Sequence, residues 1–226
     1  MHVSARKGDS LSRLSTDVHE CRACPRLVDW REQVAREKRA AFRDDDYWGR
    51  GVSGFGDHAA RLLVLGLAPA AHGANRTGRV FTGDRSGDWL YRAMHKAGFA
   101  NQPTSTHRDD GLRLTNAWVT AAVKCAPPGN APLPEERLAC RPFLERELAL
   151  LSDLRVVVCL GNFAYQAAAE HFALRPRPKF GHGVEACVGG LTLICSFHPS
   201  QQNTFTGKLT EPMIDAVFAR ARELVG

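Results

Sequence analysis

The sequence has no uninterrupted apolar run approaching the roughly 18 residues of a membrane-spanning helix, because Lys and Arg interrupt every candidate. Its first residues, MHVSARKGDSLSRLSTD, also have no apolar segment of the kind found in a secretory signal peptide. The seven cysteines are an odd number and a small fraction of 226 residues, which argues against a secreted disulfide scaffold. We therefore expect a protein of the reducing cytoplasm.

The common nucleotide-binding signatures are missing as well. No Gly-Lys-Ser/Thr closes a phosphate loop, and the spaced glycines of GVSGFG precede an apolar segment instead of following one. Internal repeats and low-complexity tracts are also absent. What remains is a composition of 44% apolar and 24% charged residues with a net charge of +6. These values are typical of a globular protein and are compatible with a polyanionic partner, without proving one.

Short apolar segments alternate with stretches of helical periodicity. Continuous apolar runs predict buried strands at 61–67, 112–123 and 154–161, and a Gly-Gly hairpin is predicted at 184–199. Helical patterns cover 10–41 with one interruption, 84–98, 134–151, 162–172 and 211–224. This alternation predicts an α/β fold of three layers, with a small, mostly parallel central sheet flanked by helices. We expect a single domain over residues 1–226.

Three loops follow the predicted strands and are therefore expected to meet at the carboxyl edge of the sheet, where such folds bind ligands. They are 66–83, 125–133 and 198–208. Around two of them the basic residues exceed the acidic ones, five to two over 66–96 and four to one over 171–210. His198 directly follows a predicted strand, so it is expected to point into this edge. Excess positive charge here is what a phosphate-binding surface requires.

Four of the cysteines indicate a metal site. Cys21 and Cys24 form a C-x2-C pair, whereas Cys125 and Cys140 lie over a hundred residues later, and two of the four fall in polar or proline-rich loops. The other three lie in apolar segments and are most simply core residues. Four thiolates suit tetrahedral zinc or an iron–sulfur cluster, and four unrelated buried thiols are the alternative. The spacing matches neither a zinc ribbon nor a ferredoxin, so it leaves the metal open.

Three long segments carry a family resemblance, namely GLAPAAHGANRTGRVFTGDRSG (66–87), TNAWVTAAVKCAPPGNAPLPEE (115–136) and HPSQQNTFTGKLT (198–210). Together with the four-cysteine pattern, they closely resemble the signature segments of the family 5, or type B, uracil-DNA glycosylases. The resemblance implies the uracil-DNA glycosylase fold and a [4Fe–4S] cluster on the four cysteines, with zinc as the alternative. This cluster is then expected to tie in a helical N-terminal segment, 10–45. The implied activity is removal of uracil, and of other deaminated or damaged bases, from double-stranded DNA.

The resemblance also implies roles for individual residues in handling an extruded base. Phe81 matches the aromatic residue that stacks on the base, and stacking contributes about 1–3 kcal/mol. Asn116 matches the residue that reads the base edge, since an amide both accepts from and donates to uracil. His198 is the expected donor to the charge that develops on uracil O2. The loop containing Ala68 and His72 is expected to assist through its backbone N–H groups.

The sequence leaves the identity of the general base open among three alternatives. Other branches of the superfamily place a polar side chain on the first loop, but this chain has Leu67 and Ala68 there. Asp84 matches an acidic residue proposed to serve the water or the sugar, and it is equally well explained as the N-cap of the following helix. A third possibility is a reaction driven by leaving-group stabilisation, with an unassisted water.

Contacts to DNA are expected from side chains on the same loops. The candidates are Arg76, Arg79, Ser200, Asn203 and Lys208. Gln201, Gln202, Asn203 and Phe205 are unranked candidates for filling the gap that the extruded nucleotide leaves. No lysine stands beside the expected base site, so we predict a monofunctional, monomeric glycosylase that leaves an abasic site uncut. A non-catalytic DNA-binding module and an iron–sulfur electron carrier are the alternative functions.

Overall fold

A computed structural model describes residues 8–226. Its helices in chain order are α1 (Leu11–Glu20), α2 (Pro25–Glu37), η1 (Ala40–Phe42), α3 (Ala74–Thr77), α4 (Arg85–Lys96), η2 (Pro128–Asn130), α5 (Pro134–Leu150), α6 (Asn162–His171), α7 (Gln201–Phe205) and α8 (Glu211–Val225). Its strands are β1 (Phe55–Gly56), β2 (Leu62–Gly66), β3 (Ala117–Ala121), β4 (Val156–Leu160), β5 (Glu185–Val188) and β6 (Leu191–Ser196). No helix among residues 8–226 has both the length and the apolar character needed to cross a bilayer.

The strands form one sheet in the order β1-β3-β2-β4-β6-β5. The four central strands are parallel, and the two edge strands β1 and β5 run antiparallel to their neighbours. All residues of β2, β3 and β4 are buried, because helices cover both faces of the sheet. The predicted α/β class and mostly parallel sheet are therefore confirmed.

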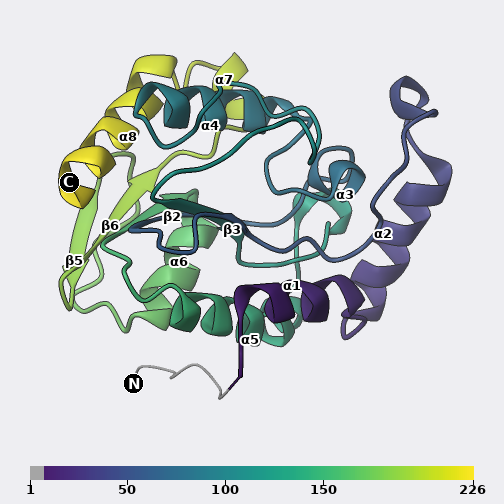
Figure 1. The fold of residues 1–226 in the computed structure, drawn as a ribbon, viewed down its shortest axis with the longest axis horizontal. Coiled ribbons are helices and arrows are strands. Elements are labelled where there is room, and N and C mark those ends of the chain that lie inside the picture. The colour runs from purple at the N-terminus through teal and green to yellow at the C-terminus, as the bar shows by residue number, and fades with distance from the viewer. Residues whose placement is uncertain (1–7) are drawn as a thin grey trace.

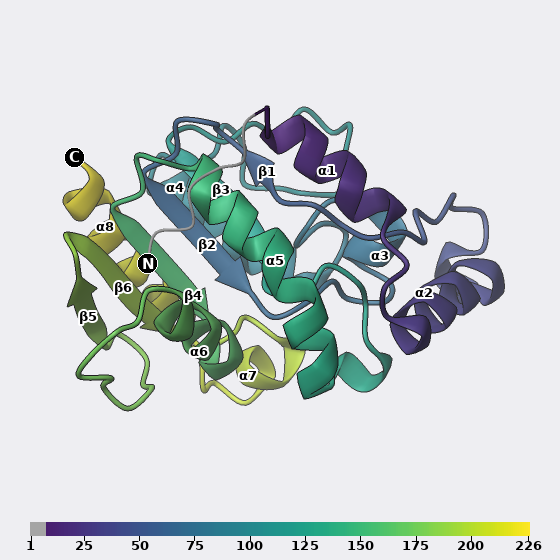
Figure 2. The same ribbon diagram turned by 90° about the horizontal axis from the view of Figure 1, so that it is seen from below.

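Alternate residues of β2 face opposite layers. Leu62 and Val64 belong to a core shared with α4 and α8, and Leu63 and Leu65 belong to a second core shared with α1, α5 and α6. Figure 1 shows α4 and α8 above the sheet, and Figure 2 shows α1, α5 and α6 across the opposite face. Because successive side chains of a strand point to opposite faces of the sheet, each face packs against its own layer of helices, which gives the expected three layers.

The elements that the sequence did not predict are short. Strand β1 has two residues, and helices α3 and α7 have four and five residues, too few for a recognisable period. The strand expected over 112–123 is also shorter, because only Ala117–Ala121 pairs with its neighbour. This last difference matters for function, because it decides at which end of the sheet Asn116 lies.

Candidate active site at the carboxyl edge of the sheet

Phe81 and His198 are neighbours at the carboxyl edge of the sheet. Phe81 lies between α3 and α4, and His198 follows β6 by two residues. Their ring centroids are 5.9 Å apart and the ring planes are inclined by 35°. Both side chains are half-buried, so each has a face or edge in contact with solvent. Two predicted site residues separated by more than a hundred positions are thus brought together.

The backbone at Phe81 adopts a strained conformation that a neighbouring glycine accommodates. Phe81 has a φ of +51°, a left-handed conformation that is uncommon for a bulky residue and costs on the order of 1–3 kcal/mol. A Cβ at Gly87 would overlap the Phe81 carbonyl, so only glycine fits at that point of α4. Strain of this kind persists only where the surroundings enforce it, and it is concentrated at functional sites.

The imidazole of His198 is neutral near pH 7. Burial lowers its pKa from 6.5 to about 4, because a charged ring loses hydration there. The ring makes no hydrogen bond with any residue in 8–226, whereas the His198 carbonyl accepts one from Asn203 Nδ2 at 2.8 Å. The main chain of His198 is therefore anchored and its ring nitrogens remain available to a ligand.

Asp84 is an N-cap and also lies against the first loop. Its Oδ1 accepts from the Gly87 amide at 3.0 Å, which caps α4, and a Cβ at Gly73 would overlap its other carboxylate oxygen. Burial raises the pKa of Asp84, although the amides of Gly87 and Ser86 act in the opposite direction. One oxygen thus caps the helix while the second faces the 70–73 turn. The two functions expected of Asp84 are not mutually exclusive.

The loop after β2 presents unpaired backbone donors. The amides of Ala68 and Ala70 donate to no other residue in the described part of the chain, and both residues are half-buried. His72 turns towards the segment before the loop, where its Nδ1 is 3.0 Å from Tyr47 Oη. Burial lowers the pKa of His72. The loop can therefore hold a negative ligand atom through its main chain, without the imidazole of His72.

Asn116 is at the wrong end of the sheet to join this site, which corrects the sequence-based placement. It precedes β3, and its neighbour Ala117 pairs with Leu62 at the start of β2, whereas Gly66 at the end of β2 pairs with Ala121. Its Oδ1 accepts from the Arg61 amide at 2.9 Å. The prediction took Asn116 as part of a longer strand, but the residue closes a turn at the amino edge.

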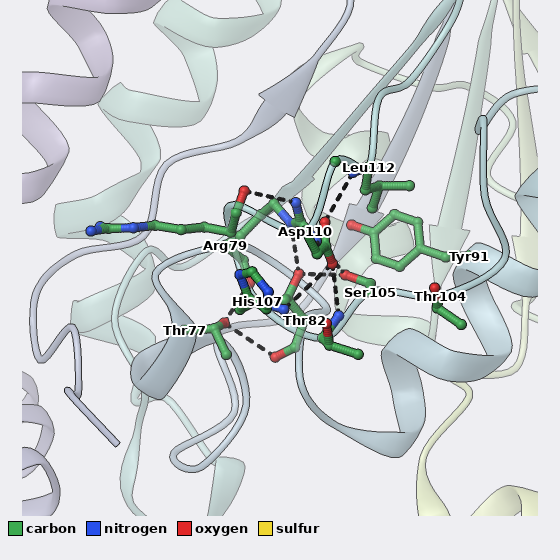
Figure 3. Close-up of polar contacts among 12 residues, drawn as sticks. Thr77, Arg79, Thr82, Tyr91, Thr104, Ser105, His107, Asp110 and Leu112 are labelled. Atoms are coloured by element: carbon green, nitrogen blue, oxygen red, sulfur yellow. Dashed lines mark hydrogen bonds and ion pairs between the residues drawn. The ribbon is translucent and has the colours of Figure 1, made fainter. Parts of the chain in front are cut away.

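Two arginines expected to contact DNA are instead used within the protein. Arg79 is 5% exposed and donates to Asp110, Ser105 and Thr82. Although burial acts to raise the pKa of Asp110, its hydrogen bonds with Arg79 and with backbone amides lower that pKa to about 2. Figure 3 shows this network joining the loop before α4 to the 104–112 segment. Arg76 pairs with Asp45 at 2.5 Å and donates to the carbonyls of His72 and Gly83. Both therefore brace loops, and their guanidinium groups are largely buried and already engaged within the protein.

The other expected DNA contacts lie around α7. Ser200 caps this helix, with its Oγ accepting from the Asn203 amide at 3.3 Å. Lys208 is exposed, and its Nζ lies 5.0 Å from the centre of the Phe197 ring. Of the five candidates, Lys208 is thus the cation best placed for a solvent-borne anion. Lys124, in contrast, is buried against Glu147 at 2.6 Å.

The four cysteines line one common cavity, although they come from distant segments. Cys21 and Cys24 flank the α1–α2 connection, Cys125 follows β3, and Cys140 lies in α5. Leu27, Val28 and Phe143 complete the apolar wall. Within residues 8–226, no three His, Cys, Asp or Glu side chains are grouped closely enough to hold one metal ion.

A buried arginine beside these thiols was not predicted. Arg31 is 2% exposed, and its Nη1 donates to Cys125 Sγ and its Nη2 to the Cys21 carbonyl, both at 2.9 Å. No carboxylate in the described part of the chain pairs with it, and its buried Nε has no partner. A buried cation without a counter-ion is costly, so the site is suited to an anionic group. The available sequence signal was its helical spacing with Leu27 and Val34, which places it on the buried face of α2.

Comparisons with known proteins agree with this architecture. Residues 53–222 match the family model described as the uracil DNA glycosylase superfamily. A type-5 uracil-DNA glycosylase of Mycobacterium tuberculosis is 55% identical over 221 residues, covering 96% of this chain and 82% of the relative. One from Thermus thermophilus is 52% identical over 208 residues, covering 91% and 94%. A type-4 enzyme of Thermotoga maritima is 30% identical over 150 residues, covering 66% and 69%. The chain therefore belongs to the uracil-DNA glycosylase superfamily and, within it, to the type-5 branch.

Proposed function

We propose that this protein excises uracil from double-stranded DNA by hydrolysing the N-glycosidic bond, as a monofunctional and monomeric enzyme of base-excision repair. The observation that carries the proposal is the Phe81–His198 pair, with ring centroids 5.9 Å apart at the carboxyl edge of the sheet. An aromatic face beside an uncommitted imidazole matches an extruded pyrimidine, whose flat ring stacks and whose carbonyls accept hydrogen bonds. The names of the relatives support the same reaction.

The leaving base departs as an anion, so catalysis requires donors aimed at uracil O2. His198 is neutral at physiological pH, since the pKa of its ring lies at about 4. One ring nitrogen of neutral His198 then donates an N–H, and the free amides of Ala68 and Ala70 supply further donors from the loop after β2. Removing one such donor from an enzyme typically lowers kcat by about 10²- to 10³-fold.

Asp84 supplies the negative charge that acts on the sugar and on the attacking water. Ionised, its carboxylate stabilises the oxocarbenium-like sugar and orients the attacking water, while its Oδ1 continues to cap α4. Its raised pKa follows from the same burial that strengthens these electrostatic interactions. The functional and capping roles of Asp84 therefore rest on one conformation of the side chain.

The substrate range extends beyond uracil in this proposal. With Asn116 at the far edge, the carboxyl end of β3 carries only Ala121 and Ala122. No side-chain amide at that end of the strand contacts the edge of the base. A base with other exocyclic groups than uracil therefore does not leave a buried amide without a hydrogen-bond partner, and it is not rejected on that ground. This supports removal of other deaminated bases, such as hypoxanthine and xanthine, from the same duplex.

We further propose that Cys21, Cys24, Cys125 and Cys140 hold a [4Fe–4S] cluster. When bound, such a cluster supplies four metal–thiolate links between the N-terminal helical segment and the chain around β3 and α5. The fit rests on the shared cavity and on Arg31, whose buried positive charge suits the negative charge of thiolate-ligated iron. The N-terminal segment is thereby tied to the rest of the domain.

The deciding experiment uses a labelled duplex with one uracil, incubated with the purified protein and then divided. Alkali converts abasic sites into strand breaks, and an untreated aliquot reveals any lyase activity. Breaks at uracil only after alkali support the monofunctional glycosylase. Tight binding without breaks contradicts the proposal and favours the non-catalytic DNA-binding module. A His198→Ala variant controls for contaminating enzymes.

A further inference from the structure

The loop between α6 and β5, residues 172–184, carries positive charge that the proposed chemistry does not use. It contains no Asp or Glu. Its three basic side chains are all exposed: Arg175, Arg177 and Lys179. The one carboxylate in the whole stretch from 171 to 210 is that of Glu185, and Arg220 of α8 pairs with it at 2.8 Å. The cations of the α6–β5 loop are therefore not neutralised from within their own segment.

This loop is anchored beside the residue that precedes His198. The Phe197 amide donates to Nδ1 of His182 at 3.2 Å, and the centroids of the two rings are 5.3 Å apart. Further back in the loop, the Pro178 carbonyl accepts from Tyr165 Oη of α6 at 2.8 Å. Because Phe197 directly follows β6, the second half of the loop lies at the carboxyl edge of the sheet, next to the proposed active site.

Two of the three cations belong to this anchored half, namely Arg177 and Lys179. Arg177 lies between two prolines, whose fixed φ angles leave the backbone little freedom to lose when a ligand binds. Lys179 is followed by Phe180, whose ring centroid is 6.3 Å from that of Phe197. Both side chains are therefore presented to solvent from a braced backbone.

Duplex DNA requires cations at this edge, and those of the first loop are already engaged. Arg76 and Arg79 are held in ion pairs within the protein. Lys208 is exposed, and its Nζ lies 5.0 Å from the centre of the same Phe197 ring that anchors the α6–β5 loop. Exposed Lys and Arg that neutralise phosphates supply the sequence-independent part of the affinity for DNA.

We propose that the α6–β5 loop is a further DNA-binding element, in which Arg177 and Lys179 each contact a backbone phosphate of the duplex beside the base that is removed. The inference rests on the proposed glycosylase function, because it takes the substrate duplex of that enzyme as the ligand. Phosphate contacts carry no information about the base, so this surface holds undamaged and uracil-containing DNA alike. It therefore acts before any base is extruded, while the protein moves along DNA.

The test measures the affinity of the purified holoprotein for an undamaged duplex at several salt concentrations. The slope of log K against log salt loses about 0.9 for each phosphate contact removed, so Arg177→Gln/Lys179→Gln is expected to reduce its magnitude by about 1.8. At about 0.1 M salt, the affinity itself is expected to fall about tenfold or more. A duplex with a non-hydrolysable uracil nucleotide is expected to lose the same factor.

Two control variants separate a direct contact from net charge and from the structure of the loop. Arg113→Gln/Arg155→Gln removes two charges from exposed side chains that precede β3 and β4, at the amino edge of the sheet. Arg177→Lys/Lys179→Arg keeps both charges of the α6–β5 loop. Both controls are expected to keep the slope of the wild-type protein.

An unchanged slope in Arg177→Gln/Lys179→Gln overturns the inference, and so does an equal decrease in either control. A loss confined to the uracil-containing duplex also contradicts it, because such a loss belongs to recognition of the base. The slope is measured on undamaged DNA and does not depend on excision. A wild-type protein that binds this duplex but releases no uracil from DNA therefore overturns the proposed function and leaves the binding surface in place.

Discussion

The ring of Phe81 lies directly over Gly66 at the end of β2. Two of its ring carbons are 2.6 and 2.8 Å from where a Cβ of residue 66 would stand. Gly66→Ala is therefore expected to displace the ring and to weaken binding of uracil-containing DNA by about 5- to 100-fold, the range given by stacking of one base. Affinity for a duplex with a non-hydrolysable uracil nucleotide measures the effect.

A double-mutant cycle separates this effect from general damage to the strand. In a Phe81→Leu background, the added methyl group meets a smaller side chain, so Gly66→Ala is expected to cost little further affinity. Additive losses in the double variant contradict a role through the Phe81 ring.

Asp84→Asn separates the two roles of Asp84. The amide oxygen still accepts from the Gly87 amide, and a buried carboxylate with a raised pKa is removed, so stability at pH 7 is expected to be unchanged or higher. Excision is expected to fall about 100-fold or more, because the negative charge is lost. Asp84→Ala additionally loses the cap, at about 1 kcal/mol. Urea unfolding and single-turnover rates measure both properties, and an Asn variant of nearly full activity leaves Asp84 as a cap only.

The lowered pKa of His198 predicts a pH-dependent stability. Between its ordinary value of 6.5 and the folded-state value of about 4, the unfolded chain binds a proton that the folded chain does not. With respect to His198, the free energy of unfolding is therefore highest above pH 6.5 and decreases as the pH falls towards 4. The His198→Gln variant has no titratable group at this position, so the wild-type protein is expected to lose stability relative to the variant as the pH falls from 6.5 to 4. Urea titrations at several pH values check the difference, and a constant difference refutes it.

Arg31→Gln tests the charge beside the four cysteines. The variant removes the cation that donates to Cys125 Sγ, so iron and sulfide content after purification is expected to fall, with affinity for the cluster reduced about 10- to 100-fold. Visible absorbance of the fresh protein gives an independent readout. Arg22→Gln is the matched control, since Arg22 is exposed and its one ion pair among residues 8–226 is with Glu32. Equal iron content in both variants argues against a role for Arg31.

Asn116 is expected to matter for stability and not for base recognition. Asn116→Ala loses the hydrogen bond from the Arg61 amide and puts alanine at a φ of +56°, a change of about 1–3 kcal/mol in the free energy of unfolding. Asn116→Gly keeps the backbone conformation and loses less. Excision of uracil, and discrimination against cytosine, are expected to match wild type in both variants. A selective loss of discrimination contradicts the placement of Asn116 at the amino edge.

Much of the architecture follows from local patterns. The continuous apolar run at 61–67 contains β2, and Asp84 caps α4 as expected, because strands buried on both faces and capped helices leave short-range signals. His198 was placed correctly for a similar reason, since a residue that directly follows a parallel strand must lie at its carboxyl edge.

Other assignments depended on contacts between distant residues. Arg79 was an expected DNA contact, but its charge is taken up by Asp110, 31 residues later, which nothing in the loop sequence indicates. Arg31 is similar, because its partner thiol lies 94 residues away. The sequence alone indicated the long helices and the central strands, and therefore which loops follow those strands. Only the tertiary structure decided which side chains at that edge remain free, because hydrogen bonds and ion pairs form between atoms close in space, whatever their separation along the chain.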